Sequence, residues 1–207
     1  MRDEWGVLRE LLFTQHAPSW EKTEWGVHPN VTKIKICGLR EIEHALVAAE
    51  AGVDFLGLVF AESRRRVSMD RAREIIEGVR ESARVIPQFV GVFVNESPDL
   101  VNAAVARCGL DYVQLSGDEP WSYCREIAVP VIKVVRVRDV HSIRQEAAVA
   151  AEEQRRHPRS LMLLDSCVHG TYGGTGHTFD WVLAVEFSAQ ATIVLAGGLH
   201  PGNVLTA

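Results

Sequence analysis

The feature that most limits the possible fold is a regular alternation between short apolar runs and amphipathic segments after residue 32. Seven runs rich in β-branched residues follow one another, at 33–37, 54–60, 88–94, 111–115, 131–137, 161–165 and 192–197. Each run is apolar almost throughout, which is typical of parallel strands that are covered on both faces. The alternation therefore predicts repeated right-handed βαβ units.

Segments with helical periodicity separate these runs. Helices are predicted over 40–51, 68–80 and 139–157, and between Ser97 and Gly109. Ser97 and Pro98 have the cap and the first-turn proline of a helix start, and Gly109 is a typical stop signal.

Two architectures accommodate such units, an open doubly wound sheet and an eight-stranded β/α barrel. The doubly wound sheet usually has a Gly-rich turn after its first strand, whereas only Cys37-Gly38 follows here. Seven units in strict succession favour an α/β fold of the (β/α)8 TIM-barrel type, with seven of the eight strands present. The sequence ends at Ala207, where a seventh helix is expected to begin after Pro201.

The first 32 residues have a different pattern and are predicted to be an N-terminal extension and linker. Residues 3–16 fit an amphipathic helix that uses Trp5, Leu8 and Leu12. Residues 33–207 are predicted to form the barrel domain, truncated at its C-terminus.

Composition excludes several classes of partner and site. The net charge is −5 and the positive residues are scattered, so a nucleic-acid surface is not expected. No apolar stretch is long enough to span a bilayer, and the acidic start Met-Arg-Asp-Glu does not resemble a signal peptide, so the expected compartment is the cytoplasm. The four cysteines and eight histidines have no metal-ligand spacing, so neither a metal site nor a disulfide framework is expected.

Polar residues at the carboxyl ends of barrel strands are candidates for function. These ends carry Cys37, Asn95, Ser116, Arg136, Asp165 and the Gly197-Gly198 pair. Cys37 is either a small buried filler or a thiolate that acts as a base or nucleophile. Asp165 either caps the following loop or faces the barrel mouth, where desolvation would let it deliver a proton near neutral pH.

The segment Gly173-Gly174-Thr175-Gly176 gives the strongest physical signal for a ligand. Three glycines in four residues allow backbone N–H groups to converge on one anion, and a helix is expected to start at Phe179-Asp180-Trp181. The Gly197-Gly198 pair follows the seventh apolar run and could add further N–H groups. Because barrel phosphate sites are commonly built from the late loops, the two Gly-rich segments indicate a phosphorylated ligand.

Seven motifs occur together in a fixed order. They are KIKICGL at 33–39, GLVFAESRRRVS at 57–68, VGVFVN at 90–95, VQLSGDE at 113–119, LLDS at 163–166, YGGTGHTFDW at 172–181 and LAGGLHPGNV at 195–204. In this order they resemble the phosphoribosylanthranilate isomerase family of tryptophan biosynthesis over roughly residues 33–207. KICGL and YGGTGxTFDW are the specific ones, and the others would be weak alone.

The resemblance implies an Amadori rearrangement of a small phosphorylated substrate, without cofactor or metal. It assigns Asp165 as the general acid and Cys37 as the general base, and it places Arg65 at the anthranilate carboxylate. It also assigns Gly173, Gly174, Thr175, Gly176, Gly197 and Gly198 to substrate binding, at the phosphate. It names neither a nucleic-acid nor a membrane partner, and the oligomeric state is unknown.

This chain departs from the family pattern in two of these motifs. Ser116 stands where the family usually has histidine, and His177 replaces the usual lysine after the glycine loop. The Ser-Ser-Gly turn of the family's eighth strand has no counterpart in the sequence.

Two alternatives stay open at this stage. One is another phosphosugar barrel isomerase, which would be expected to use paired aspartates, and the other is an inactive fragment that at most binds phosphate. Without an eighth strand, the first and the seventh strand would have unpaired edges. We therefore expect a chain that is aggregation-prone or partly open and has little or no isomerase activity.

Overall fold

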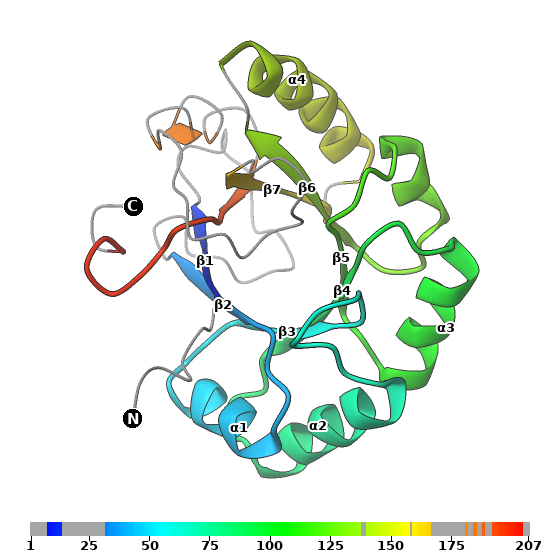
Figure 1. Cartoon of the computed structure of the whole chain (residues 1–207), viewed down its shortest axis with the longest axis vertical. Helices are drawn as coiled ribbons and strands as arrows, with labels where there is room; N and C mark the ends of the chain where they lie inside the picture. Colours follow the sequence, from blue (N-terminus) through cyan, green and yellow to red (C-terminus); the bar gives the residue numbers. More distant parts are fainter. Residues whose placement is uncertain are drawn as a thin grey trace.

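The strands form one closed barrel in which they follow each other in chain order, β1 to β8 (Figure 1). The computed structural model describes residues 8–13, 32–137, 140–157, 159–166, 181, 184–185, 188 and 192–204. The strands are β1 Leu8–Phe13, β2 Lys33–Cys37, β3 Phe55–Val59, β4 Gln88–Phe93, β5 Tyr112–Leu115, β6 Val131–Val137, β7 Leu161–Ser166 and β8 Ile193–Leu195. The helices are α1 Ile42–Glu50, α2 Met69–Ser82, α3 Pro98–Cys108, the 3-10 turn η1 Trp121–Glu126 and α4 Val140–Arg156. Strands β2 to β8 are all parallel, which confirms the seven predicted strands and the barrel fold class.

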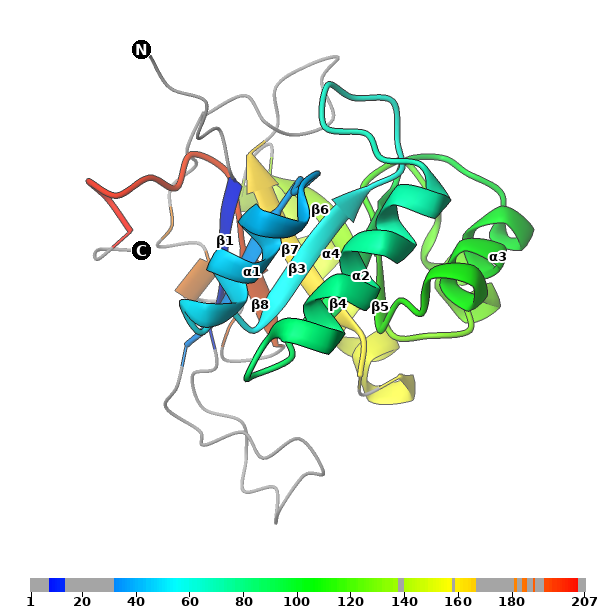
Figure 2. The same ribbon diagram turned by 90° about the horizontal axis from the view of Figure 1, so that it is seen from below.

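Alternate residues of these strands face the inside and the outside of the barrel. One buried cluster fills the inside and includes Phe55, Val90, Tyr112, Ile132, Leu163 and Val194. Their strand neighbours, such as Leu56, Phe89 and Val113, belong to an outer cluster with the buried faces of the helices. Helices α1 to α4 accordingly lie around the outside of the sheet (Figures 1 and 2). Burial on both faces explains why each run is apolar throughout.

The helix ends follow the predicted signals. Ser68 caps α2, because its hydroxyl accepts a hydrogen bond from the backbone N–H of Arg71 at 3.1 Å. Ser97 precedes α3, whose C-cap Gly109 has the left-handed φ of 71°. The η1 turn after β5 was not predicted, because it lacks an apolar period of its own.

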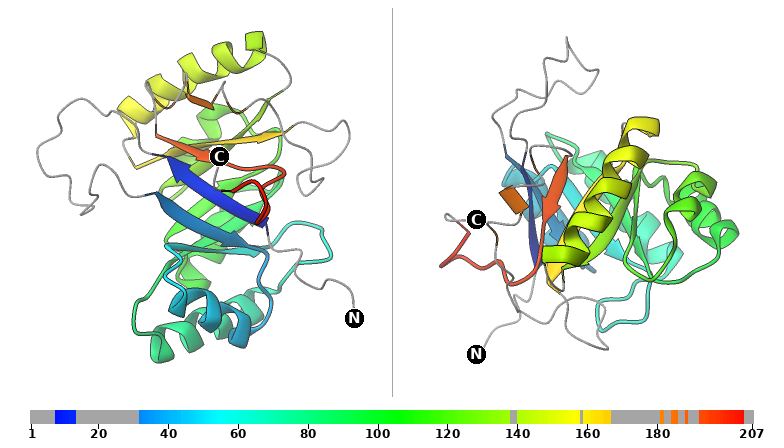
Figure 3. Two further views of the ribbon diagram at one scale, coloured as in Figure 1. Left: turned by 90° about the vertical axis from the view of Figure 1, so that its left-hand side faces the viewer. Right: turned by 90° about the horizontal axis from the view of Figure 1, so that it is seen from above.

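Strand β1 overturns the prediction of a helix over residues 3–16, since Leu8–Phe13 are extended. It lies antiparallel between β2 and β8, with Glu10 in register with Lys35 and Leu12 in register with Val194 (Figure 3, left). The physical reason is that the edges of β2 and β8 carry backbone groups that only a strand can pair. Tertiary pairing outweighs the helical preference of a Leu-rich segment.

The expectation of a partly open barrel is therefore wrong, because the described strands form a closed ring. Leu11 is in register with both Ile34 of β2 and Leu195 of β8, so both edges have a partner. The instability argued from unpaired edges loses its basis. Among the described residues, no helix has the length and apolar character needed to cross a bilayer.

Candidate active site

A cavity of about 320 Å³ opens at the carboxyl ends of the parallel strands. It is lined by Cys37, Val59, Ala61, Glu62, Ser63, Arg65, Val92, Val94, Gln114, Ser116, Val134, Arg136 and Asp165. Cys37, Arg65 and Asp165, which the sequence singled out from three separate segments, therefore share one cavity. Its walls combine a thiol, two carboxyl groups and two guanidinium groups with smaller polar and apolar side chains.

Cys37 is the last residue of β2 and is 4% exposed. Its neighbour in register on β3 is Gly57. A Cβ atom on residue 57 would lie 2.6 Å from the Cys37 sulfur, so a side chain there would displace the thiol. The glycine in the β3 run therefore reserves the space for Cys37.

Arg65 reaches the cavity because the loop after β3 folds back onto that strand. The N–H of Val67 donates to the carbonyl of Val59 at 2.8 Å, which returns the chain to the strand end. The Arg65 side chain is half-buried and donates from Nη1 to the carbonyl oxygen of Cys37 at 3.2 Å. Gly38, with a φ of 89°, makes this approach possible, since a Cβ there would lie 2.6 Å from the Arg65 Cδ.

The other two arginines of the triplet have different surroundings. Arg64 and Arg66 are exposed, and Arg66 forms an ion pair with Glu62 at 3.0 Å. Only the middle arginine lines the cavity.

Asp165 lies near the end of β7 and is in register with Arg136 of β6. Both side chains line the cavity. Arg136 is held by the loop after β5, donating to a carboxylate oxygen of Asp118 at 2.9 Å and to the carbonyl oxygen of Ser116 at 2.5 Å. The cavity thus contains the Asp165 carboxyl group of β7 and the Arg136 guanidinium of the neighbouring strand β6.

Asn95 is a strand-end candidate that supports the site without lining the cavity. It has a φ of 51°, and its side-chain oxygen accepts from the N–H of Asp118 at 2.7 Å. The N–H of Asn95 in turn donates to Glu119 at 2.7 Å, and Glu119 is paired with the buried Lys133 at 3.3 Å. These bonds fix the loop that carries Ser116.

The predicted phosphate residues are only partly described. Gly197 and Gly198 follow β8, are buried, and have positive φ values of 86° and 67°. They lie at the same end of the barrel as the cavity but are not among its lining residues. Gly173, Gly174, Thr175 and Gly176 fall outside the described residues.

Sequence reasoning missed Gln114, which lines the cavity and is 5% exposed. The available signal was an amide in an otherwise apolar strand. Gln114 is two residues from both Tyr112 and Ser116, so the three side chains point to the same, inner face of the barrel. The buried Lys35 on β2 carries the same signal.

Two further described cysteines do not line the cavity, and burial favours their neutral thiol form over the thiolate. Burial raises the pKa of Cys108, and it raises the pKa of Cys124 to about 11. Within the described ranges, no group of three or more His, Cys, Asp or Glu side chains has an arrangement suited to a metal ion. A reaction without a metal stays a prediction.

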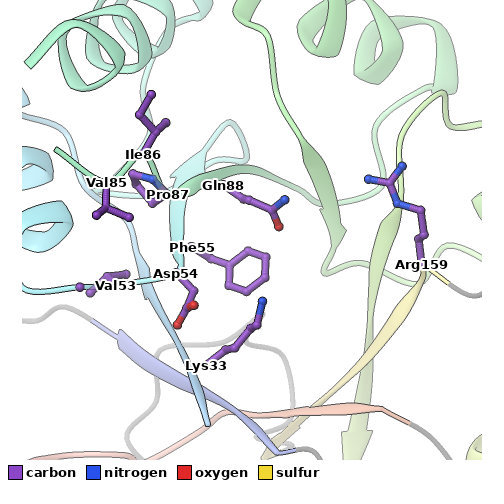
Figure 4. Close-up of a pocket in the computed structure, with 10 residues that line it drawn as sticks. Lys33, Val53, Asp54, Phe55, Val85, Ile86, Pro87, Gln88 and Arg159 are labelled. Carbon is purple, nitrogen blue, oxygen red and sulfur yellow. The ribbon is translucent and has the colours of Figure 1, made fainter. Parts of the chain in front are cut away.

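A second, larger cavity of about 470 Å³ lies at the opposite, amino-terminal end of the strands. Figure 4 shows Lys33 pointing toward Phe55 in this pocket, with the Lys33 ammonium 5.9 Å from the ring centroid. Arg159 also lines this pocket. Since active sites in this fold lie at the carboxyl ends of the strands, we place the candidate active site in the smaller cavity.

A family model described as N-(5'-phosphoribosyl)anthranilate (PRA) isomerase matches residues 34–207. Among curated relatives, the N-(5'-phosphoribosyl)anthranilate isomerase of Dehalococcoides mccartyi is 40% identical over 175 residues, covering 83% of this chain and 78% of the relative. The enzyme of the same name from Roseiflexus castenholzii is 45% identical over 178 residues, covering 84% of this chain and 81% of the relative.

Solved structures give the same result. The crystal structure of phosphoribosyl anthranilate isomerase from Thermotoga maritima has a TM-score of 0.70 and 35% identity, covering 83% of this chain and 80% of that chain. A phosphoribosyl anthranilate isomerase in complex with reduced 1-(o-carboxyphenylamino)-1-deoxyribulose 5-phosphate has a TM-score of 0.67 and 33% identity. The match covers 83% of this chain and 78% of that chain. Sequence, barrel and matched length agree, and the chain belongs to the phosphoribosylanthranilate isomerase family.

Proposed function

We propose that this chain catalyses the Amadori rearrangement of N-(5'-phosphoribosyl)anthranilate to 1-(2-carboxyphenylamino)-1-deoxyribulose 5-phosphate, as a step of tryptophan biosynthesis. The observation that carries the proposal is the convergence of Cys37, Arg65 and Asp165 on one cavity at the carboxyl ends of the strands. The names of its relatives and the ligand of the related structure support this substrate.

The first chemical step opens the sugar ring. Asp165 donates a proton to the ring oxygen while the bond from that oxygen to C1 breaks, and the anthranilate nitrogen supplies the electrons that form an iminium ion. A general acid is needed because the leaving oxygen would otherwise depart as an alkoxide.

The second step moves the double bond. The Cys37 thiolate removes the proton from C2, which the adjacent iminium makes acidic, and the C2–H electrons form the C1–C2 double bond as the nitrogen becomes neutral. The resulting enolamine becomes the ketone when C1 gains a proton and the C2 hydroxyl loses one. Acid and base come from β7 and β2, so the sugar can lie between them.

We infer that Arg65 binds the anthranilate carboxylate, since a guanidinium offers two parallel N–H donors to it. The phosphate is assigned to the late Gly-rich segments, Gly173-Gly174-Thr175-Gly176 and Gly197-Gly198.

The test is to incubate the purified chain with N-(5'-phosphoribosyl)anthranilate and to separate substrate and isomeric product by chromatography. Conversion well above the rate without protein supports the proposal. A rate equal to that of the protein-free control, in a folded sample, would exclude it.

A further inference from the structure

A buried ammonium lies beneath the candidate active site, and the proposed proton transfers do not use it. Lys35 is on the inner face of β2, two residues before Cys37, and is 1% exposed. Its Nζ donates to the side-chain oxygen of Gln114 on β5, at 2.8 Å. A buried charge of this kind needs hydrogen-bond partners, because desolvation is otherwise costly.

Gln114 forms a second hydrogen bond, which extends the chain of hydrogen bonds toward the cavity. Its side-chain nitrogen donates to the hydroxyl oxygen of Ser116 at 3.0 Å. In the structure the amide oxygen faces Lys35 and the amide NH2 faces Ser116, an orientation that suits an ammonium donor at Lys35. Both Gln114 and Ser116 line the cavity, whereas Lys35 lies beneath it.

The direction of this chain of hydrogen bonds determines whether the Ser116 hydroxyl can donate a hydrogen bond to a ligand. Its oxygen accepts from Gln114, and no hydrogen bond between described residues uses this hydroxyl as the donor. The Ser116 backbone is fixed at both groups, because its N–H donates to Phe93 at 2.8 Å and its carbonyl accepts from Arg136. The hydroxyl proton is thus available to an acceptor in the cavity.

We propose that Ser116 binds substrate by donating a hydrogen bond to a sugar oxygen, and that Lys35 and Gln114 are positioning residues that keep it a donor. This inference rests on the proposed isomerase function and adds a polar contact at a position where the family usually has histidine. A contact to a sugar oxygen that does not change charge strengthens ground state and transition state alike. Its loss should therefore appear in KM rather than in kcat.

Gln114→Glu is the most informative substitution, because it changes the direction of the chain and hardly changes its shape. A carboxylate accepts from Lys35 and also accepts from the Ser116 hydroxyl, which then no longer donates into the cavity. The variant retains the buried pairing of Lys35, so it should fold. Ser116→Ala removes the donor outright and leaves Gln114 in place.

The experiment titrates the full chain with reduced 1-(o-carboxyphenylamino)-1-deoxyribulose 5-phosphate by calorimetry, alongside steady-state kinetics. Ser116→Ala and Gln114→Glu should each weaken binding by about 2- to 12-fold, the range of one neutral hydrogen bond. The double variant should bind no more weakly than either single variant, since both remove the same donor.

Three results would overturn the inference. Unchanged binding by Ser116→Ala excludes the contact, and wild-type binding by Gln114→Glu excludes the directional role of Gln114. Additive losses in the double variant would mean that the two residues act separately. A folded wild-type chain that binds no analogue would overturn the isomerase function and this inference together, which distinguishes that outcome from the other three.

Discussion

At the scale of single residues, the site depends on the glycine next to Cys37 as well as on the reactive groups themselves. Gly57→Ala would place a methyl group 2.6 Å from the Cys37 sulfur. We expect this variant to fold with a displaced thiol and to lose at least about 10-fold in kcat, because misplaced reacting groups are costly. Alkylation of Cys37 by iodoacetamide, followed by peptide mass mapping, would report the displacement. Gly78→Ala in α2 is the control for a glycine substitution, since Gly78 has no positive φ and a Cβ there would meet only the Ile42 side chain, at 3.1 Å. Equal kcat values for the Gly57→Ala variant and the wild type would contradict this account.

Arg65 allows a second test at this scale. Arg65→Ala should weaken binding of the reduced product analogue by about 10- to 100-fold, as expected for a hydrogen bond to a charged group, and should weaken inorganic phosphate binding much less. The affinity of the Arg65→Lys variant for the analogue should lie between those of the wild type and Arg65→Ala, because lysine retains the charge without the bidentate geometry. Calorimetric titration of both ligands measures the difference. Equal weakening of the two would make Arg65 a general electrostatic contributor.

The residues of the site were predictable to different degrees. The strand-end rule indicated Cys37 and Asp165 from the sequence, and the family resemblance added Arg65, which no spacing alone singles out from its triplet. Gln114 was missed because its contact with Lys35 joins strands 79 positions apart in the chain. Such a pairing depends on barrel register, which periodicity does not provide.

At the scale of the elements, the seven parallel strands and the helices between them followed from local signals, among them the caps of α2 and α3. The N-terminal segment did not. Its Leu-rich pattern fits a short helix as well as a strand, and the deciding contacts come from β2 and β8, of which β8 lies near the other end of the sequence. Short apolar segments are ambiguous for this reason.

Strand β1 can be tested by removing one of its backbone donors. Leu11→Pro should lower the free energy of unfolding by about 1–3 kcal/mol or more, because Leu11 lies between two paired strands and proline removes its one backbone N–H from the ladder. Leu11→Val keeps the N–H and suits a strand, so it is the matched control. Urea unfolding followed by circular dichroism provides the comparison. Identical midpoints for the two variants would show that β1 does not contribute to barrel stability.

At the scale of the whole molecule, closure of the barrel helps to position the proposed catalytic groups. β1 completes the ring next to β2, the strand that carries both Lys35 and Cys37. A closed ring fixes the strand ends relative to each other, and acid–base catalysis needs its two groups at defined positions. The sequence predicted the ring of parallel strands, whereas its antiparallel closure depends on long-range pairing that no local pattern encodes.

The most direct measurement compares kcat for the conversion of N-(5'-phosphoribosyl)anthranilate by the wild-type chain, Cys37→Ala and Asp165→Asn. We expect the wild-type chain to turn over and each variant to lose about 10²- to 10⁴-fold in kcat, the usual contribution of a positioned acid or base. Affinity for the reduced product analogue should barely change, because each group acts mainly in the transition state. Near-normal turnover by either variant would remove that residue from its role, and near-normal turnover by both would contradict the placement of the active site in this cavity.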